Sequence, residues 1–115
     1  MWAAEDTPSR RAGVAEVFAA LGDRTRLQLV GQLGAGGLLS IAQLTAGTAI
    51  SRQGVTKHLQ VLADAGLVCD VKCGRERRWQ LAPERIDEAR RALDAIGAHW
   101  ETALGRIKRF VEADV

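Results

Sequence analysis

The sequence has few cysteines, few prolines and no long apolar run, and each shortage excludes a class of protein. Two cysteines in 115 residues cannot form a disulfide framework. No run approaches the roughly 18 apolar residues of a membrane-spanning helix, and residues 1–6 lack the basic and apolar parts of a signal peptide. The hydrophobic fraction of 47% and the charged fraction of 26% exclude a disordered chain. We therefore expect a cytoplasmic protein without membrane contact.

The length is that of one domain with a small core. We expect residues 1–8 to form a mobile N-terminal tail and residues 9–115 to form a single domain. A large enclosed substrate pocket is not expected at this size, unless two chains build it together.

The positive charge is concentrated in one stretch of the chain. The net charge of the whole protein is only +2. Residues 51–78 contain six basic and three acidic residues, whereas the stretches on either side are close to neutral. A local basic patch on a near-neutral chain is typical of a site for a polyanion, and a solvated basic face is the alternative.

Hydrophobic periodicity and capping residues predict four helices in the first 66 residues. Serine and aspartate precede three of these helices, as is usual for N-caps. The predicted boundaries are a first helix ending near Gly22, a second from Asp23 to the glycines at 34–37, a short third after Ser40, and a fourth from Ser51 to Gly66. A tight turn at residues 45–50 separates the third helix from the fourth.

After Gly66 the apolar period changes to two, which predicts a β-hairpin with a charged turn at residues 74–76. Cys69 and Cys73 fall on one face of the first strand, together with Leu67. Four residues of strand separate the two cysteines by about 13 Å, whereas a disulfide needs Cα atoms within about 7 Å. We expect both thiols to pack against the core, and redox sensing remains a minor alternative.

The last helix is expected to begin at Pro83 and to extend for about 30 residues. Its apolar residues recur at alternating steps of three and four, from Ile86 to Phe110. At about 1.5 Å per residue the helix is roughly 45 Å long, which exceeds what a domain of this size needs for its own core. The surplus stripe is expected to bury against another chain.

Two short helices joined by a tight turn, followed by a basic hairpin, predict a winged helix-turn-helix. The fourth helix fits a major groove about 12 Å wide. Arg52 and Gln53 can make bidentate contacts to purine edges, whereas the other helix residues suit phosphates. The wing arginines would reach flanking backbone or the minor groove. The predicted DNA-binding residues are Ser51, Arg52, Gln53, Thr56, Lys57, His58, Arg75, Arg77 and Arg78.

Four stretches of the sequence resemble the ArsR family of bacterial winged-helix regulators: residues 17–27, 50–59, 62–68 and 74–81. The resemblance extends from about Val14 to Glu112, and the C-terminal part is similar to a metal-independent branch. It implies a mainly α fold with a small β-hairpin, a homodimer built from the first and last helices, and repression at an inverted repeat, often in the protein's own promoter. The expected dimer-interface residues are Val14, Phe18, Leu93, Ile96, Trp100, Leu104, Ile107 and Phe110.

The chain departs from the family pattern in the turn before the fourth helix and within that helix. The family usually has glycine where Ala49 stands, and a left-handed Ala49 would cost about 1 kcal/mol. Gly47 is the alternative position for the bend. Gly54 inside the helix costs about 1 kcal/mol relative to alanine, and either permits close approach to a phosphate or has no role.

No catalytic, metal-binding or cofactor-binding residues are expected. The third helix lacks the Cys-x-Cys pair by which many family members bind metal, and the last helix has His99 as its single imidazole. A site across the dimer from Asp94, His99 and Glu101 is the remaining metal alternative. Ser51 and His58 could share a face of the fourth helix, but no acid on that helix is placed to orient the imidazole, so an enzyme is not expected.

Two alternatives to the simple repressor stay open. One is a sensor of the same fold that responds to a ligand, a metal or redox state, for which the sequence names no inducer. The other is a winged helix used for protein contacts, which would not need the six cations of residues 51–78.

Overall fold

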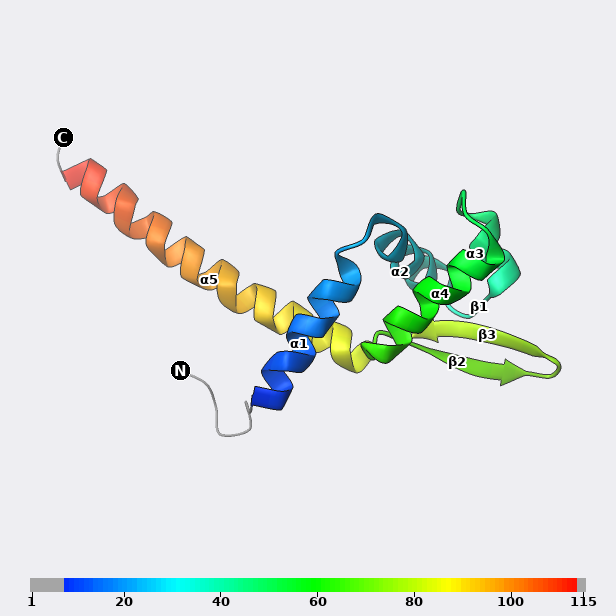
Figure 1. Ribbon diagram of the computed structural model, residues 1–115. Helices are drawn as coiled ribbons and strands as arrows, with labels where there is room; N and C mark the ends of the chain where they lie inside the picture. Colours follow the sequence, from blue (N-terminus) through cyan, green and yellow to red (C-terminus); the bar gives the residue numbers. More distant parts are fainter. Residues whose placement is uncertain (1–7, 114–115) are drawn as a thin grey trace.

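A computed structural model describes residues 8–113, with side chains from residue 13 onward. The predicted tail over residues 1–8 lies outside the described residues except for Pro8, where the first helix begins. The elements are α1 (Pro8–Leu21), α2 (Arg24–Gly36), β1 (Leu39–Ser40), α3 (Ile41–Ala46), α4 (Arg52–Asp64), β2 (Val68–Cys73), β3 (Glu76–Leu81) and α5 (Pro83–Ala113). Figure 1 shows α5 projecting from the other helices at one end and the β2–β3 hairpin at the other, and the molecule measures 68 × 34 × 20 Å.

Side-chain caps define the starts of three helices, as predicted from their residue types. The Asp23 carboxylate accepts a hydrogen bond from the Arg26 amide at 3.0 Å. The Ser40 hydroxyl accepts from the Gln43 amide at 3.2 Å, and the Gln43 side chain accepts from the Ser40 amide at 2.9 Å, which completes a capping box. The Ser51 hydroxyl accepts from the Gly54 amide at 3.1 Å. The boundaries of α2, α3 and α4 therefore follow from groups that satisfy the first amides of each helix.

The sheet contains the predicted hairpin and one strand that was not predicted. Strands β2 and β3 pair antiparallel, and β1 adds to the other edge of β3, giving the order β1-β3-β2. In β1, Leu39 pairs with Trp79 and Ser40 with Arg78. Two residues are too short to show a period of two, so β1 carries no strand signal in the sequence.

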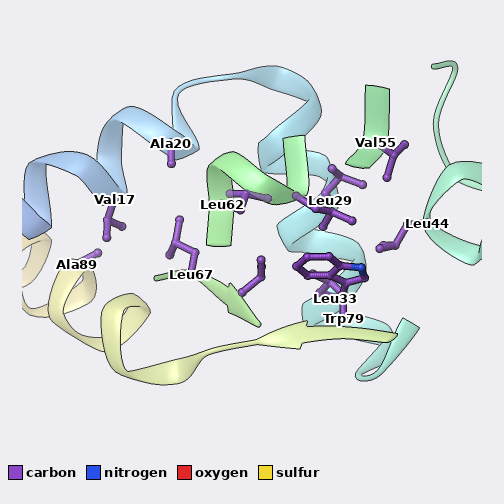
Figure 2. Close-up of a cluster of buried hydrophobic side chains, with 12 residues drawn as sticks. Val17, Ala20, Leu29, Leu33, Leu44, Val55, Leu62, Leu67, Trp79 and Ala89 are labelled. Carbon is purple, nitrogen blue, oxygen red and sulfur yellow. The ribbon is translucent and has the colours of Figure 1, made fainter. Parts of the chain in front are cut away.

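The core lies where α1, α2 and α4 meet the sheet. Its fully buried side chains include Leu29 of α2 and Val55, Leu59 and Leu62 of α4. Figure 2 shows Trp79 of β3 reaching toward the leucines of the helices. The predicted apolar side of the fourth helix is therefore its buried side.

The packing role expected for both cysteines is wrong for Cys69, which is exposed. Leu67 lies before the strand, and both Leu67 and Val68 are buried. The inward face of the hairpin therefore begins at Val68, which pairs with Leu81, and Cys69 falls on the opposite face. Cys73 is partly buried.

The turn between α3 and α4 needs no left-handed residue. Within residues 8–113, positive φ angles occur only at Gly37, Gly66 and Gly74, so neither Ala49 nor Gly47 adopts one. Gly47 instead leaves room for the side chain of Gln32, whose amide end would have to move if a Cβ were present. The Gln28 side chain also donates to the Gly47 carbonyl at 2.9 Å. Helix α2 therefore holds the turn through the hydrogen bond of Gln28, and Gln32 lies close beside it.

Only the first part of α5 packs on its own domain. Ala89 is buried and Ile86 contacts the core, whereas large apolar side chains from Leu93 onward are exposed. The exposed residues are Leu93, Ile96, Trp100, Leu104, Ile107, Phe110 and Val111. None of the described helices, α5 included, combines the length and apolarity needed to cross a membrane. The apolar stripe thus continues beyond the surface that the domain can cover.

Gly66 should be intolerant of alanine, whereas Gly31 should favour it. Gly66 has a φ of 79°, and a Cβ would lie 2.9 Å from Cγ of Arg85. Gly66→Ala should therefore lower the free energy of unfolding by about 1–2 kcal/mol. Gly31 lies inside α2 with no atom near its Cβ position, so Gly31→Ala should raise that energy by about 0.5–1 kcal/mol. Urea unfolding followed by circular dichroism measures both changes in the free energy of unfolding. Equal effects would contradict the conclusion that Gly66 is intolerant of alanine and Gly31 is not.

Candidate nucleic-acid interface

Helix α4 presents a polar face opposite its buried side. Arg52, Gln53, Thr56 and Lys57 are exposed, whereas Val55 on the other side is completely buried. Successive residues of a helix are separated by about 100°, so these side chains occupy one outward surface. The structure therefore brings together four of the six predicted helix contacts.

The hydroxyl groups on this helix already have partners, whereas the long side chains do not. Thr56 Oγ1 donates to the Arg52 carbonyl at 2.8 Å, and Ser51 Oγ accepts the capping bond. A capping hydroxyl keeps its own proton to donate. Within the described part of the chain, the side chains of Arg52, Gln53 and Lys57 make no hydrogen bond or ion pair of their own. These three are the groups ready to bind a ligand without first losing a contact.

Gln60 belongs to the same surface but was missed in the sequence. It is exposed, and its amide donates to Asp64 Oδ1 at 3.0 Å. It follows Thr56 by four residues and Gln53 by seven, which places all three on one side of the helix. This helical spacing from Thr56 and Gln53 could have identified Gln60 from the sequence.

Gly54 faces the turn rather than the solvent. A Cβ at this position would lie 3.3 Å from Cδ1 of Ile50. The absence of a side chain therefore allows Ile50 to pack against the start of α4. This contact gives Gly54 a role other than the two considered from the sequence.

His58 lies apart from the outward surface. Its side chain is 25% exposed and its Nδ1 atom lies 3.3 Å from Nη1 of Arg26 and 3.8 Å from Oδ2 of Asp23. Both partners belong to the start of α2. With Nδ1 facing α2, only Nε2 is left for the predicted phosphate contact.

The arginines of the hairpin differ in how they are paired. Arg77 forms an ion pair with Asp70 at 2.9 Å, and Arg78 forms one with Glu76 at 3.2 Å. Arg75, in the turn, is exposed and has no ion pair within the described residues, and the same holds for Lys72. Exposed pairs contribute little, so Arg77 and Arg78 can exchange their partners for a phosphate. Within the described residues, Lys72 is thus a second unpaired cation of the wing, and it was not among the predicted DNA-binding residues.

A hydrogen bond from the backbone perturbs the carboxyl group at the start of α2. The pKa of Asp23 is lowered from its ordinary value of 3.8, chiefly because the Arg26 amide donates to the carboxylate. The nearby charge of Arg26 acts in the same direction, while burial opposes both effects. The ionised form is thus the one that the folded protein stabilises.

Beside this surface the described part of the chain has an open groove and no metal site. No three metal-ligating side chains cluster within residues 8–113. A shallow open groove of about 340 Å³ lies between α1 and α4. Its lining residues are Glu16, Ala19, Ala20, Arg26, Val61, Asp64 and Ala65. The groove adjoins the C-terminal end of the outward polar face of α4, since Asp64 in its lining accepts the hydrogen bond from Gln60.

The geometry defines a class of protein. Two short helices joined by a turn, with a polar face on the second helix and a basic hairpin behind it, form a winged helix-turn-helix. A family model described as a helix-turn-helix domain matches residues 21–69, which span α2, α3 and α4.

Comparisons with known proteins identify the family. The chain is 36% identical over 95 residues to the HTH-type transcriptional regulator Rv2034 of Mycobacterium tuberculosis, covering 83% of this chain and 85% of that protein. An ArsR-like transcriptional regulator from Rhodococcus sp. RHA1 superposes with a TM-score of 0.73 at 38% identity, over 89% of this chain and 95% of the other. The chain therefore belongs to the ArsR family of winged helix-turn-helix transcriptional regulators, which are not enzymes. The predicted family and fold class are confirmed.

A third match shows the fold alone. The winged helix-turn-helix DNA-binding domain Mb0332 of Mycobacterium bovis has a TM-score of 0.65 at 21% identity, over 85% of this chain and 89% of that domain. That domain is homodimeric.

The lowered pKa of Asp23 predicts a pH-dependent contribution to stability. Because the folded pKa lies below the unfolded one, the contribution is present above the unfolded value and is lost as pH falls through the folded value. Asp23→Ala should destabilise the protein at pH 7 and much less at about pH 2.5. Asp23→Asn keeps an N-cap acceptor without a titrating charge, so it should remain close to wild type at pH 7. Thermal unfolding of the three proteins at both pH values measures this, and a pH-independent loss in Asp23→Ala would refute it.

Proposed function

We propose that this chain is a cytoplasmic, homodimeric repressor that binds an inverted repeat of double-stranded DNA, including one in its own promoter. The observation that carries this proposal is the outward face of α4 beside a basic hairpin, because Arg52, Gln53 and Lys57 on that face have no side-chain partners in the described chain. Membership of the regulator family supports DNA as the ligand. The dimer, the operator and the sign of regulation are parts of the proposal.

Helix α4 enters the major groove with its first turns toward the bases. Arg52 and Gln53 are exposed there and read purine edges through bidentate hydrogen bonds. Ser51, Thr56 and Lys57 contact phosphates and fix the register of the helix. Gln60 extends the reading surface by one turn.

The wing holds the DNA backbone beside the groove. Arg75 at the tip is unpaired within the described residues, so it is the first cation to meet a phosphate. Arg77 and Arg78 follow by giving up exposed ion pairs to Asp70 and Glu76. These contacts add affinity and salt dependence without base preference.

A second copy of the chain covers the apolar stripe of α5. Trp100 is 63% exposed and Phe110 is 75% exposed, and such side chains seldom form a continuous exposed row on a monomer. Val14 and Phe18 of α1 are partly buried beside α5 and extend the same surface. A two-fold axis through this surface presents two α4 helices to an inverted repeat.

Fluorescence anisotropy tests the function directly. The probe is a duplex from the gene's own upstream region, compared with a scrambled duplex at two salt concentrations. We expect a preference of about 10³-fold or more, with a steep salt dependence. Equal weak binding to both duplexes would refute self-regulation at that site, and absence of binding at low salt would favour the protein-contact alternative.

Arg52 and Arg75 should affect DNA binding in different ways. Arg52→Ala should weaken the cognate duplex by about 1–3 kcal/mol and leave the scrambled duplex nearly unchanged, because base contacts carry specificity. Arg75→Ala should weaken binding to both duplexes alike and reduce the salt slope by about 1, because contacts to phosphates do not depend on the base sequence. Arg91→Ala on α5 is the matched control, since this exposed arginine pairs with Asp87 on its own helix and should leave both affinities unchanged. The reverse pattern would assign base reading to Arg75 and the phosphate contact to Arg52.

Trp100→Glu should convert the dimer into a monomer. A carboxylate in the middle of the apolar stripe would lose its hydration on burial against the partner. Ala98→Glu is the control, because Ala98 is exposed on the other side of α5 and should remain dimeric. Sedimentation velocity distinguishes the two states, and dimers of Trp100→Glu would show that α5 is not the interface.

A further inference from the structure

Arg26 occupies the junction between three helices. Its Nε donates to the Ala20 carbonyl near the end of α1 at 2.6 Å, and its Nη1 lies 3.3 Å from Nδ1 of His58 on α4. Its own amide donates to the Asp23 cap at the start of α2. One side chain therefore connects the end of α1 and the start of α2 with the middle of α4.

The chemistry of the pair fixes the tautomer of His58. A guanidinium group has donors only, so the Arg26–His58 contact is a hydrogen bond only if Nδ1 carries no proton. The imidazole proton then resides on Nε2. Asp23 Oδ2, at 3.8 Å from Nδ1, is beyond hydrogen-bond distance in this arrangement.

This bond is the single side-chain hydrogen bond that joins α4 to another element within residues 13–113, whose side chains the structure describes. The other side-chain hydrogen bonds of α4 remain within the helix or its cap. Its apolar contacts through Val55, Leu59 and Leu62 are strong but non-directional. A rotation of about 20° about the helix axis moves surface atoms by about 2 Å, which is enough to break a hydrogen bond to a base. A directional contact is therefore what can define the rotation of α4.

We propose that Arg26 and His58 are a positioning pair, which sets the orientation of α4 and so determines DNA affinity through side chains other than those that read the bases. The inference rests on the proposed function, because it requires α4 to enter DNA. The pair acts by fixing where Arg52 and Gln53 lie relative to the bases. Its loss therefore weakens binding to cognate DNA more than binding to scrambled DNA.

A double-mutant cycle tests the pair. His58→Leu and Arg26→Gln should each weaken binding to the cognate duplex by about tenfold, at a temperature where all variants remain folded. The double variant should be little weaker than either single variant, because both remove the same contact. His58→Gln should restore most of the affinity, because its amide oxygen can accept from Arg26. Additive losses, or no rescue by glutamine, would overturn the pairing.

Two controls separate positioning from stability and from the proposed function. Leu33→Val changes the core of α2 two turns away from Arg26, so it should lower the melting temperature without changing the affinity for DNA. If affinity follows melting temperature across all variants, the pair is merely structural. Lys57→Gln tests the DNA surface itself: if it weakens binding and the pair variants do not, only the positioning role fails. If neither changes binding, the proposed α4 interface fails as well.

The tautomer gives a spectroscopic readout that stability does not affect. In wild-type protein with a neutral ring, ¹⁵N-correlated NMR of the His58 imidazole should show the proton on Nε2 and an unprotonated Nδ1. In Arg26→Gln the Nδ1 resonance should shift, whereas in Leu33→Val it should not. A proton on Nδ1 in the wild-type protein would overturn the assignment.

Discussion

Val55, Leu59 and Leu62 recur at steps of three and four along α4, and none of their side chains reaches solvent. Burial of each contributes about 1.5–3 kcal/mol, so turning the helix over would cost several times the energy that surface contacts provide. The surrounding elements of the domain bury these three side chains. Helix α2 packs beside α4, the hairpin follows directly from the Gly66 turn, and Trp79 joins the same cluster. The polar side of α4 faces outward because its apolar side cannot.

The same small core explains why the two ends of the molecule are extended. The helices and sheet enclose enough apolar surface for one core, and Ala89 is the last fully buried residue of α5. Beyond it, the helix has no element of its own chain to pack against, and Figure 1 shows it leaving the domain. The hairpin likewise extends past the core before Trp79, where Glu76, Arg77 and Arg78 of β3 are charged. One end is thus apolar and the other basic, which suits two different kinds of partner.

The parts predicted from the sequence are those that local chemistry controls. The caps Asp23, Ser40 and Ser51 were identified because an acceptor before an apolar period satisfies specific amides. The inward phase of β2 was missed because Leu67 precedes the strand, and the role of Gly47 was missed because Gln32 approaches it from another helix. The contact of Arg26 with His58 joins residues 32 positions apart, so no local pattern could indicate it. Neighbours brought together by the fold had to be seen in the structure.

The outward side chains of α4 bond within their own helix or not at all in the described chain, so the fold does not depend on them. Substitutions at such surface positions usually change stability by no more than about 0.5 kcal/mol. Natural proteins have little stability to lose, and sites that depend on the fold tolerate few changes. Apart from Ser51, which also caps α4, the positions exposed for recognition are separate from those that maintain the fold. A duplicated copy of the gene can therefore acquire a different operator one substitution at a time, without first gaining stability to spare.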